Sequence, residues 1–287
     1  MLNIGIIGIT EVLEPHVIQI RKNKNVNVIG KASVGTSTQL NGFHFSIPEF
    51  NRVELIERAD VLLIDNSSLL PFELLCDIVR KSKHIFLTEY LSLTIAECEQ
   101  LVKLANESRS IVQVSNPYYY TPTLQWLNKN IPAPFFLEIS QCTDGQNLFE
   151  VLYPLLLMLV DVTGISPKKV GVTAFETTQN DLGFCNVRLV FGSGSVVNLN
   201  FGSQISQNKF KIKGHAKNSF VSLNFEKKIY LHNNSKIKFS SDLSVNEFDN
   251  FVEAIQNQNQ ESSNLEDYLA AKHLVNSIEK KISQFIT

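Results

Sequence analysis

The sequence has little of what marks several large classes of protein. Of its 287 residues 19% are charged and the net charge is −2, so neither nucleic acid nor an anionic membrane surface is an expected partner. The four cysteines are scattered, without a C-x-x-C pair or a nearby histidine, which predicts buried, reduced thiols and no metal site. The longest apolar run, residues 151–160, has about half the length of a membrane-spanning helix.

No secretory signal peptide is expected, because the first expected strand begins at Asn3. Reduced cysteines and this expectation together predict a cytoplasmic protein. No internal repeat or low-complexity tract interrupts the chain, so a folded protein of one or two domains is expected.

What the sequence does contain is a regular alternation of strand-like and helix-like segments over its first 115 residues. Such an alternation predicts a parallel sheet flanked by helices. The expected strands are residues 3–7, 26–32, 61–64, 84–87 and 111–114, and the expected helices are residues 13–22, 53–57, 71–81 and 94–107. Thr94 and Glu97 have the spacing of a capping box at the start of the last helix.

The pattern changes after Asn116. A short helix, a strand and an apolar helix are followed by seven strand-like runs, and strands without helices between them predict an antiparallel sheet. These elements are residues 123–128, 135–141, 148–160, 170–177, 186–191, 195–201, 209–213, 220–225, 228–231 and 236–239, with final helices at 245–256 and 264–285. We therefore predict an α/β protein with a parallel-sheet domain (1–116) and an α+β domain (117–287) that contains a large open antiparallel sheet.

The first sixteen residues, MLNIGIIGITEVLEPH, place a glycine turn between the first strand and the first helix. Rossmann-like domains bind the pyrophosphate of a dinucleotide at this point. The G-x-G-x-x-G pattern falls on Gly8, Thr10 and Leu13, so one of its three glycines is present. Thr10 hinders the close approach of a phosphate, and Leu13 hinders close packing of the helix on the strand. We expect a Rossmann-like domain that binds a dinucleotide weakly or not at all.

Five short segments, in one order along the chain, are similar to motifs of one protein family. They are His16, residues 60–64, residues 83–94, residues 247–255 and residues 265–269. On these matches the chain resembles the glucose–fructose oxidoreductase/inositol dehydrogenase (Gfo/Idh/MocA) family. The resemblance implies an NAD(P)-dependent oxidoreductase that acts on a small, sugar-like ligand.

The same resemblance locates the catalytic positions of the family, and several of them hold other residue types here. The Glu-Lys-Pro motif aligns without gaps on Thr88, Glu89 and Tyr90, so a carboxylate stands in place of the lysine. The Asp-x-x-x-His pair aligns on Glu150 and Pro154, and proline cannot take a proton from a substrate hydroxyl. Glu89, Tyr90 and Glu150 are therefore the positional equivalents of catalytic residues.

The expected cofactor positions follow from the same alignment. They are Gly8, Ile9, Thr10, Ser33, Asn66 and Ser67. The acidic residue that commonly holds the adenosine ribose is replaced near Ser33, and serine accommodates a 2′-phosphate, which favours NADP over NAD. On the substrate side, the Gly-His pair of the family becomes Ser115 and Asn116.

Two other functions are compatible with these residues. The altered catalytic positions favour a protein derived from such oxidoreductases that no longer catalyses the reaction and binds a ligand or a partner in the former active-site cleft. An alignment shifted by one residue instead pairs Glu89 and Tyr90 with the Glu-Tyr of biliverdin reductases in this family. The tyrosines at 118–120 would then line a flat aromatic ligand, although we interpret them first as packing residues.

The second domain is also expected to associate with a second copy of the chain. Apolar residues alternate in 187–191 and 197–201, which predicts a sheet with one partly apolar face. We expect a homodimer that pairs through this C-terminal sheet.

Overall fold

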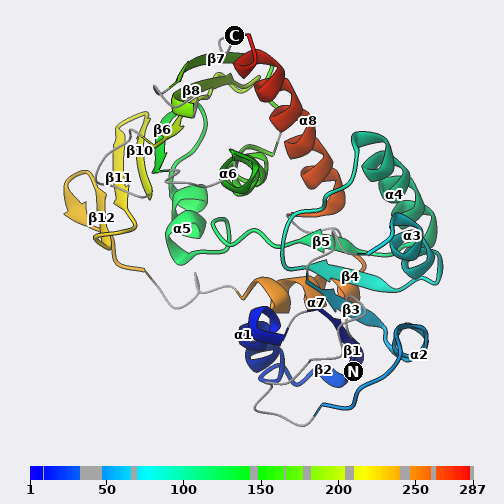
Figure 1. Ribbon diagram of the computed structural model, residues 1–287. Helices are drawn as coiled ribbons and strands as arrows, with labels where there is room; N and C mark the ends of the chain where they lie inside the picture. Colours follow the sequence, from blue (N-terminus) through cyan, green and yellow to red (C-terminus); the bar gives the residue numbers. More distant parts are fainter. Residues whose placement is uncertain are drawn as a thin grey trace. The chain divides into compact units, whose positions relative to one another are not determined.

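The computed structural model describes residues 1–8, 10–32, 47–65, 70–142, 148–164, 166–176, 182–203, 210–239, 246–259 and 263–284 (Figure 1). Its elements are β1 (Leu2–Ile7), α1 (Thr10–Ile20), β2 (Val26–Ala32), α2 (Arg52–Arg58), β3 (Val61–Ile64), α3 (Phe72–Arg80), β4 (His84–Leu87), α4 (Ile95–Ser108), β5 (Val112–Val114), α5 (Pro122–Asn130), β6 (Phe135–Cys142), α6 (Leu148–Thr163), β7 (Lys169–Glu176), β8 (Leu182–Val190), β9 (Val196–Gly202), β10 (Phe210–Ala216), β11 (Ser219–Asn224), β12 (Ile229–His232), β13 (Ser235–Lys236), α7 (Glu247–Asn257) and α8 (Leu265–Ile282). The predicted order of strands and helices is confirmed, as is the α/β fold class.

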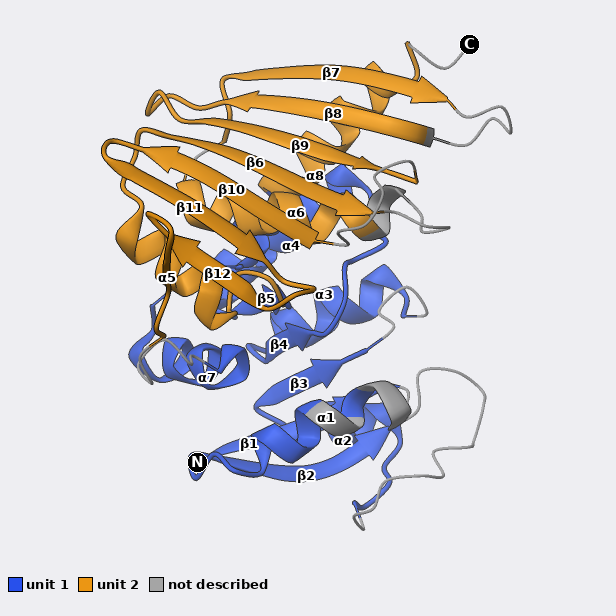
Figure 2. Cartoon of the chain, turned by 90° about the vertical axis from the view of Figure 1, so that its left-hand side faces the viewer, with its two compact units in different colours: residues 1–116, 246–269 blue, residues 117–245, 270–287 orange. Residues whose placement is uncertain are grey.

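Two compact units divide the chain. The first contains Met1–Asn116 and Asn246–Leu269, and the second contains Pro117–Val245 and Ala270–Thr287 (Figure 2).

A parallel sheet with the order β2-β1-β3-β4-β5 forms the first unit. One face of this sheet carries Ile4, Ile6 and Phe86 and packs against α1 and α7. On the opposite face Leu55 of α2 packs closely against Gly5, since a Cβ at that position would lie 2.9 Å from the Leu55 Cγ. The strand order runs outward from β1 in both directions, to β2 on one side and to β3 on the other. The carboxyl ends of β1 and β3 therefore form a topological switch point, where open α/β sheets bind ligands.

Local sequence determines where the helices of this unit begin. The Thr94 side chain accepts a hydrogen bond from the Glu97 amide at 3.2 Å, and the Glu97 carboxylate accepts one from the Thr94 amide at 2.7 Å. This is the predicted capping box at the start of α4. Asn51 caps α2 through its side-chain oxygen, which accepts from the Glu54 amide at 2.9 Å.

The segment Asn246–Leu269, which the sequence alone places in the second domain, packs within the first unit. Phe248, Phe251 and Val252 of α7 are buried together with Phe86 of β4. The ring centroid of Phe86 lies 5.4 Å from that of Phe248 and 5.4 Å from that of Phe251, in edge-on arrangements. Buried aromatic pairs of this geometry stabilise a core beyond the area that they bury, so α7 is part of the core of the first unit.

A sheet of eight strands, in the order β13-β12-β11-β10-β6-β9-β8-β7, forms the second unit. Its strand pairs are antiparallel except for β6 and β9, which are parallel. Helices α5 and α6 and the C-terminal part of α8 lie on one face of this sheet (Figure 2). None of the helices within the described ranges is both long and apolar enough to span a bilayer.

The apolar residues of β8 and β9 lie on the covered face of this sheet. Val187, Leu189, Val197, Leu199 and Phe201 are all 0% exposed. The expected apolar face is thus present, but the strand pleat directs all five side chains to the covered side, so they are not available to pair two subunits. The opposite face carries two polar pairs between these strands, Asn186 with Asn200 and Arg188 with Asn198.

Candidate functional site

The switch point of the first unit is built from the residues that follow β1, β3 and β4. The Asp65 amide donates to the Ile7 carbonyl at 2.9 Å, and the Thr88 amide donates to the Ile64 carbonyl at 3.0 Å. These parallel-ladder bonds continue the sheet by one residue beyond β3 and β4. They place Gly8, Asp65 and Thr88 beside one another at the carboxyl edge.

Gly8 is required by the packing of the protein itself. Its φ of +153° is one that L side chains rarely adopt, and a Cβ built on it would lie 2.6 Å from the Asp65 Cβ and 2.8 Å from the Leu13 Cδ1. Leu13, which stands at the third glycine position of the loop pattern, is completely buried. The packing of Asp65 and Leu13 against the turn is therefore enough to explain the glycine at position 8.

Asp65 is the charged group at this edge, and sequence reasoning missed it. The residue is only 3% exposed, and its Oδ1 accepts a hydrogen bond from the Thr88 hydroxyl at 3.0 Å. Its position directly after a fully buried strand was the available signal, because polar residues at such strand ends line the ligand edge of α/β sheets. Thr88, which aligns with the glutamate of the Glu-Lys-Pro motif, thus serves as a donor to Asp65.

His16 lies within electrostatic reach of Asp65. Burial lowers the pKa of His16, and the negative charge of Asp65 opposes that shift. Its ring centroid lies 6.4 Å from that of Phe86. Because the lowered pKa keeps the imidazole neutral at physiological pH, His16 brings little positive charge to the edge.

These residues do not fit a dinucleotide pyrophosphate. A Rossmann-like site needs a helix packed closely on the strand and loop amides that face the phosphates, whereas here Leu13 stands at the third glycine position and a buried carboxylate lies next to the turn. Of the predicted cofactor positions, Gly8 lies at this edge and Thr10 begins α1. The remaining ones, Ile9, Ser33, Asn66 and Ser67, lie outside the described residues.

The positional equivalents of the catalytic residues are not brought together by any described contact. Glu89 is exposed and Tyr90 half-buried, in the segment after β4. That segment is fixed by Tyr268, whose hydroxyl accepts from the Leu91 amide at 2.9 Å and donates to the Leu91 carbonyl at 2.7 Å. Glu150 falls in α6, in the stretch whose side chains are not described, and Pro154 is a half-buried residue in the interior of the same helix.

The expected substrate-side positions, Ser115 and Asn116, have a structural role. The Glu247 carboxylate accepts from the Ser115 hydroxyl at 2.9 Å and from the Asn116 amide at 2.6 Å. The two residues thereby hold the first residue of α7 next to the end of β5. Sequence reasoning placed this glutamate in a family motif but gave it no contact.

The three consecutive tyrosines are mainly packing residues. Tyr119 and Tyr120 are 9% and 8% exposed, with their ring centroids 5.2 Å apart. Tyr118 is half-buried, and its ring centroid lies 4.7 Å from that of Phe210. Little of these rings is left to line a flat aromatic ligand.

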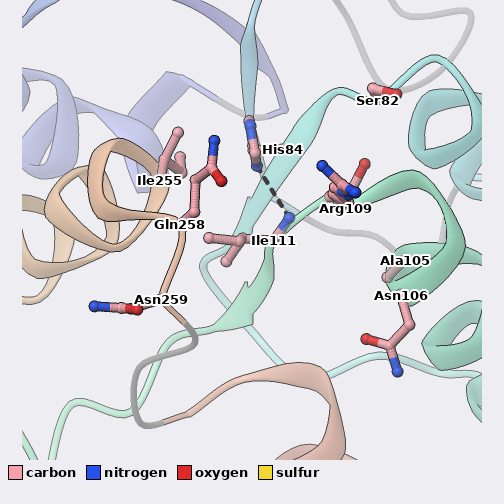
Figure 3. A pocket seen from close by; sticks show the side chains of 10 residues that line it. Ser82, His84, Ala105, Asn106, Arg109, Ile111, Ile255, Gln258 and Asn259 are labelled. Carbon is pink, nitrogen blue, oxygen red and sulfur yellow. Dashed lines mark hydrogen bonds between the residues drawn. The ribbon is translucent and has the colours of Figure 1, made fainter.

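A cavity of about 340 Å³ lies at the opposite, amino edge of the parallel sheet (Figure 3). Three of its lining residues, Ser82, Arg109 and Gln258, follow the C-terminal ends of α3, α4 and α7 in left-handed conformation. Within it, the His84 Nδ1 accepts a hydrogen bond from the Ile111 amide at 3.0 Å (Figure 3), and burial lowers the pKa of His84. Helix C-terminal ends carry partial negative charge, so this cavity is no substitute for the missing pyrophosphate site. No three His, Cys, Asp or Glu side chains within the described ranges are grouped for metal binding.

Comparison with known proteins supports the fold. No protein-family model and no curated protein matches the sequence. Among solved structures, UDP-N-acetylglucosamine 3-dehydrogenase GnnA from Acidithiobacillus ferrooxidans superposes with a TM-score of 0.79 at 14% identity, over 100% of this chain and 99% of that chain. The dehydrogenase MviM from Clostridium difficile gives 0.78 at 15% identity, over 97% and 99%. The fold is that of the Gfo/Idh/MocA dehydrogenases.

A third neighbour is an NAD-binding protein from Listeria innocua, with a TM-score of 0.76 at 14% identity, over 99% of this chain and 95% of that chain. Because each alignment spans nearly the whole of both chains, both units take part in the likeness. The family resemblance stated on short motifs is thus confirmed at the level of the fold. At these sequence identities the likeness establishes the fold alone, and the reaction has to be argued from the residues of the site.

Proposed function

We propose that this chain is a Gfo/Idh/MocA-fold protein that has lost the hydride transfer of the dehydrogenases and instead binds a small ligand or a protein partner. The observation that carries the proposal is the turn after β1, where Leu13 is completely buried at the third glycine position and packs against Gly8, so that α1 lacks the close approach to the strand that a pyrophosphate site uses. Binding of NADP or NAD is then weak or absent, with NADP favoured by Ser33.

The altered catalytic positions support the same conclusion. Oxidation of an alcohol carbon requires a proton acceptor for its hydroxyl, and the residue aligned with the family histidine is Pro154. It also requires a group that stabilises the developing oxyanion, and the residue aligned with the family lysine is the exposed carboxylate Glu89. The described residues thus supply neither group at the positions where the family has them.

We expect no detectable oxidation of myo-inositol, glucose or UDP-N-acetylglucosamine by the purified protein with NAD or NADP. Loss of general acid–base help alone slows a reaction by about 10²–10⁴-fold, and the loss of cofactor binding adds to this. The measurement is the absorbance of reduced nicotinamide, with GnnA and UDP-N-acetylglucosamine run in parallel as the positive control. The double variant Glu89→Lys with Pro154→His is expected to stay inactive, because it leaves the residues at the carboxyl edge of the parallel sheet, where the cofactor would bind, unchanged. Turnover of any of these substrates by the wild type would contradict the proposal.

A biliverdin-reductase activity is not favoured by the structure of the tyrosine segment. That hypothesis rests on the shifted alignment of Glu89 and Tyr90 and has the tyrosines at 118–120 line a flat ligand, whereas two of these rings are buried against each other. The sugar-like ligand class therefore stays the first choice for a small molecule, and a cytoplasmic location stays a prediction from the sequence.

We further propose that the chain forms a homodimer through the uncovered face of the eight-stranded sheet. Phe175 of β7 is 61% exposed, and its ring stacks on Phe184 of β8 with centroids 6.3 Å apart. This aromatic pair replaces residues 187–191 and 197–201 as the apolar part of the expected interface.

The variant Phe175→Ser is expected to shift the protein from dimer to monomer in light scattering at micromolar concentration, because central aromatic residues dominate interface energies. Val53→Ser is the control, since Val53 is 68% exposed on α2 of the first unit and lies outside the sheet that carries the proposed interface. A wild-type monomer at this concentration would contradict the dimer.

A further inference from the structure

The segments that follow the strands of the parallel sheet in the sequence contain no lysine and no arginine. These segments, which follow β1 to β5, are residues 8–10, 33–46, 65–69, 88–91 and 115–116. They include two acidic residues, Asp65 and Glu89. A Rossmann-like site that lacks basic side chains depends on loop amides and on the N-terminus of the first helix to hold the two negative phosphates.

The Asp65 carboxylate opposes that helix contribution. The N-terminus of a helix acts as about half a positive elementary charge, whereas an ionised carboxylate carries a full negative one. Asp65 is 3% exposed, and salt and water screen a buried charge much less than a surface one. The Cβ of Asp65 lies next to Gly8, and its carboxylate acts on the pKa of His16 of α1, so the negative charge is within electrostatic reach of the helix that would receive the pyrophosphate.

The orientation of Asp65 is fixed by its neighbours. Thr88 at the end of β4 donates to its Oδ1 at 3.0 Å, and its own amide is bonded to the Ile7 carbonyl at 2.9 Å. Asp65 therefore cannot leave the edge by a simple rotation without giving up the Thr88 hydrogen bond. Glu89, in contrast, is exposed and its charge is screened by water.

We propose that the Asp65 carboxylate excludes pyrophosphate-bearing ligands from this edge, so that the edge takes uncharged or cationic ligands. The inference depends on the proposed function, which has the edge no longer binding a working cofactor, and it names the group responsible. It also separates two causes of weak dinucleotide binding. One is steric, from the side chains of Thr10 and Leu13, and the other is electrostatic, from the charge of Asp65. If charge is the barrier, one isosteric substitution removes it.

The experiment compares ADP with adenosine, which share base and ribose and differ by the pyrophosphate. Binding of each is measured by isothermal titration calorimetry to the wild type and to Asp65→Asn, with NADPH followed separately by its fluorescence. Asparagine keeps an oxygen that accepts from Thr88 and removes the charge. We expect the wild type to bind ADP no better than adenosine, and Asp65→Asn to gain at least tenfold in affinity for ADP and NADPH with little change for adenosine.

Three controls make the comparison specific. Glu253→Gln removes one carboxylate from an exposed position on α7 of the same unit, and it is expected to change none of the affinities. Asp65→Glu keeps the charge and is expected to gain nothing. Thermal unfolding shows whether each variant is folded, and Asp65→Ser replaces Asp65→Asn if the latter is not.

The outcomes separate this inference from the proposed function. A wild type that prefers ADP over adenosine, or a folded Asp65→Asn that gains no ADP affinity, overturns the role of Asp65. Neither result restores catalysis, so the proposed function survives both. Turnover of a sugar substrate by the wild type would overturn the proposed function instead, whatever the effect of Asp65→Asn.

Discussion

Replacement of Gly8 by alanine is expected to destabilise the protein by about 2–5 kcal/mol, which is the sum of overpacking and of backbone strain at a φ that L residues avoid. The added Cβ would lie 2.6 Å from the Asp65 Cβ, 2.8 Å from the Leu13 Cδ1 and 3.2 Å from the Asp65 amide nitrogen. The last contact is to backbone of the sheet, which cannot move without breaking the bond to Ile7. The measurement is urea-induced unfolding, with the free energy extrapolated to water.

Gly171→Ala is the matched control for this variant. Gly171 lies on β7, and the nearest atom to its built Cβ is 3.8 Å away, an ordinary van der Waals contact. Alanine there is expected to be neutral or slightly stabilising, because it restricts the unfolded chain. Equal stabilities of Gly8→Ala and wild type would mean that Gly8 is kept free for a ligand, which would contradict the packing interpretation of the loop.

Truncation of Phe251 to alanine is expected to cost about 3–5 kcal/mol, the usual range for a phenylalanine removed from a well-packed core. The residue is 0% exposed, and its ring lies against Phe86 and Phe248 with centroids 5.4 Å and 5.8 Å away. Thermal unfolding and urea titration measure the loss. We expect the loss of stability to be in the first unit, to which Phe251 belongs although it is more than 100 residues beyond the first segment of that unit in the sequence.

Val53→Ala serves as the control for Phe251→Ala. Val53 is 68% exposed on α2 of the same unit, and surface truncations of this kind stay within about 0.5 kcal/mol of the wild type. A Phe251→Ala protein as stable as Val53→Ala would show that α7 does not belong to the core of the first unit.

Most of the secondary structure could be predicted from the sequence. The strands at 26–32, 61–64 and 84–87 have the predicted bounds, because short apolar runs between turn residues are unambiguous in an alternating α/β pattern. The Thr94–Glu97 capping box fixed the start of α4 for a purely local reason. The bounds of α1 and β8 were less accurate, because their ends carry residues without strong start or stop signals.

The candidate site was predicted less well, for a physical reason. Gly8 and Leu13 were identified from the loop pattern, but their mutual packing with Asp65 depends on β1 and β3 being neighbours in the sheet. The hydrogen bond from Thr88 to Asp65 joins the ends of two strands that are 23 residues apart. Pairings of this kind follow from strand order, which a linear pattern does not contain.

The sequence by itself determined the α/β class, the strand and helix order, the eroded glycine loop and the replacement of the expected catalytic lysine and histidine by Glu89 and Pro154. Each of these is a local property, set by periodicity, capping or residue type. Only the tertiary structure decided that α7 belongs to the first unit and that Asp65 is buried against Gly8. Both depend on long-range packing, in which apolar burial and strand order bring together residues that no local preference connects.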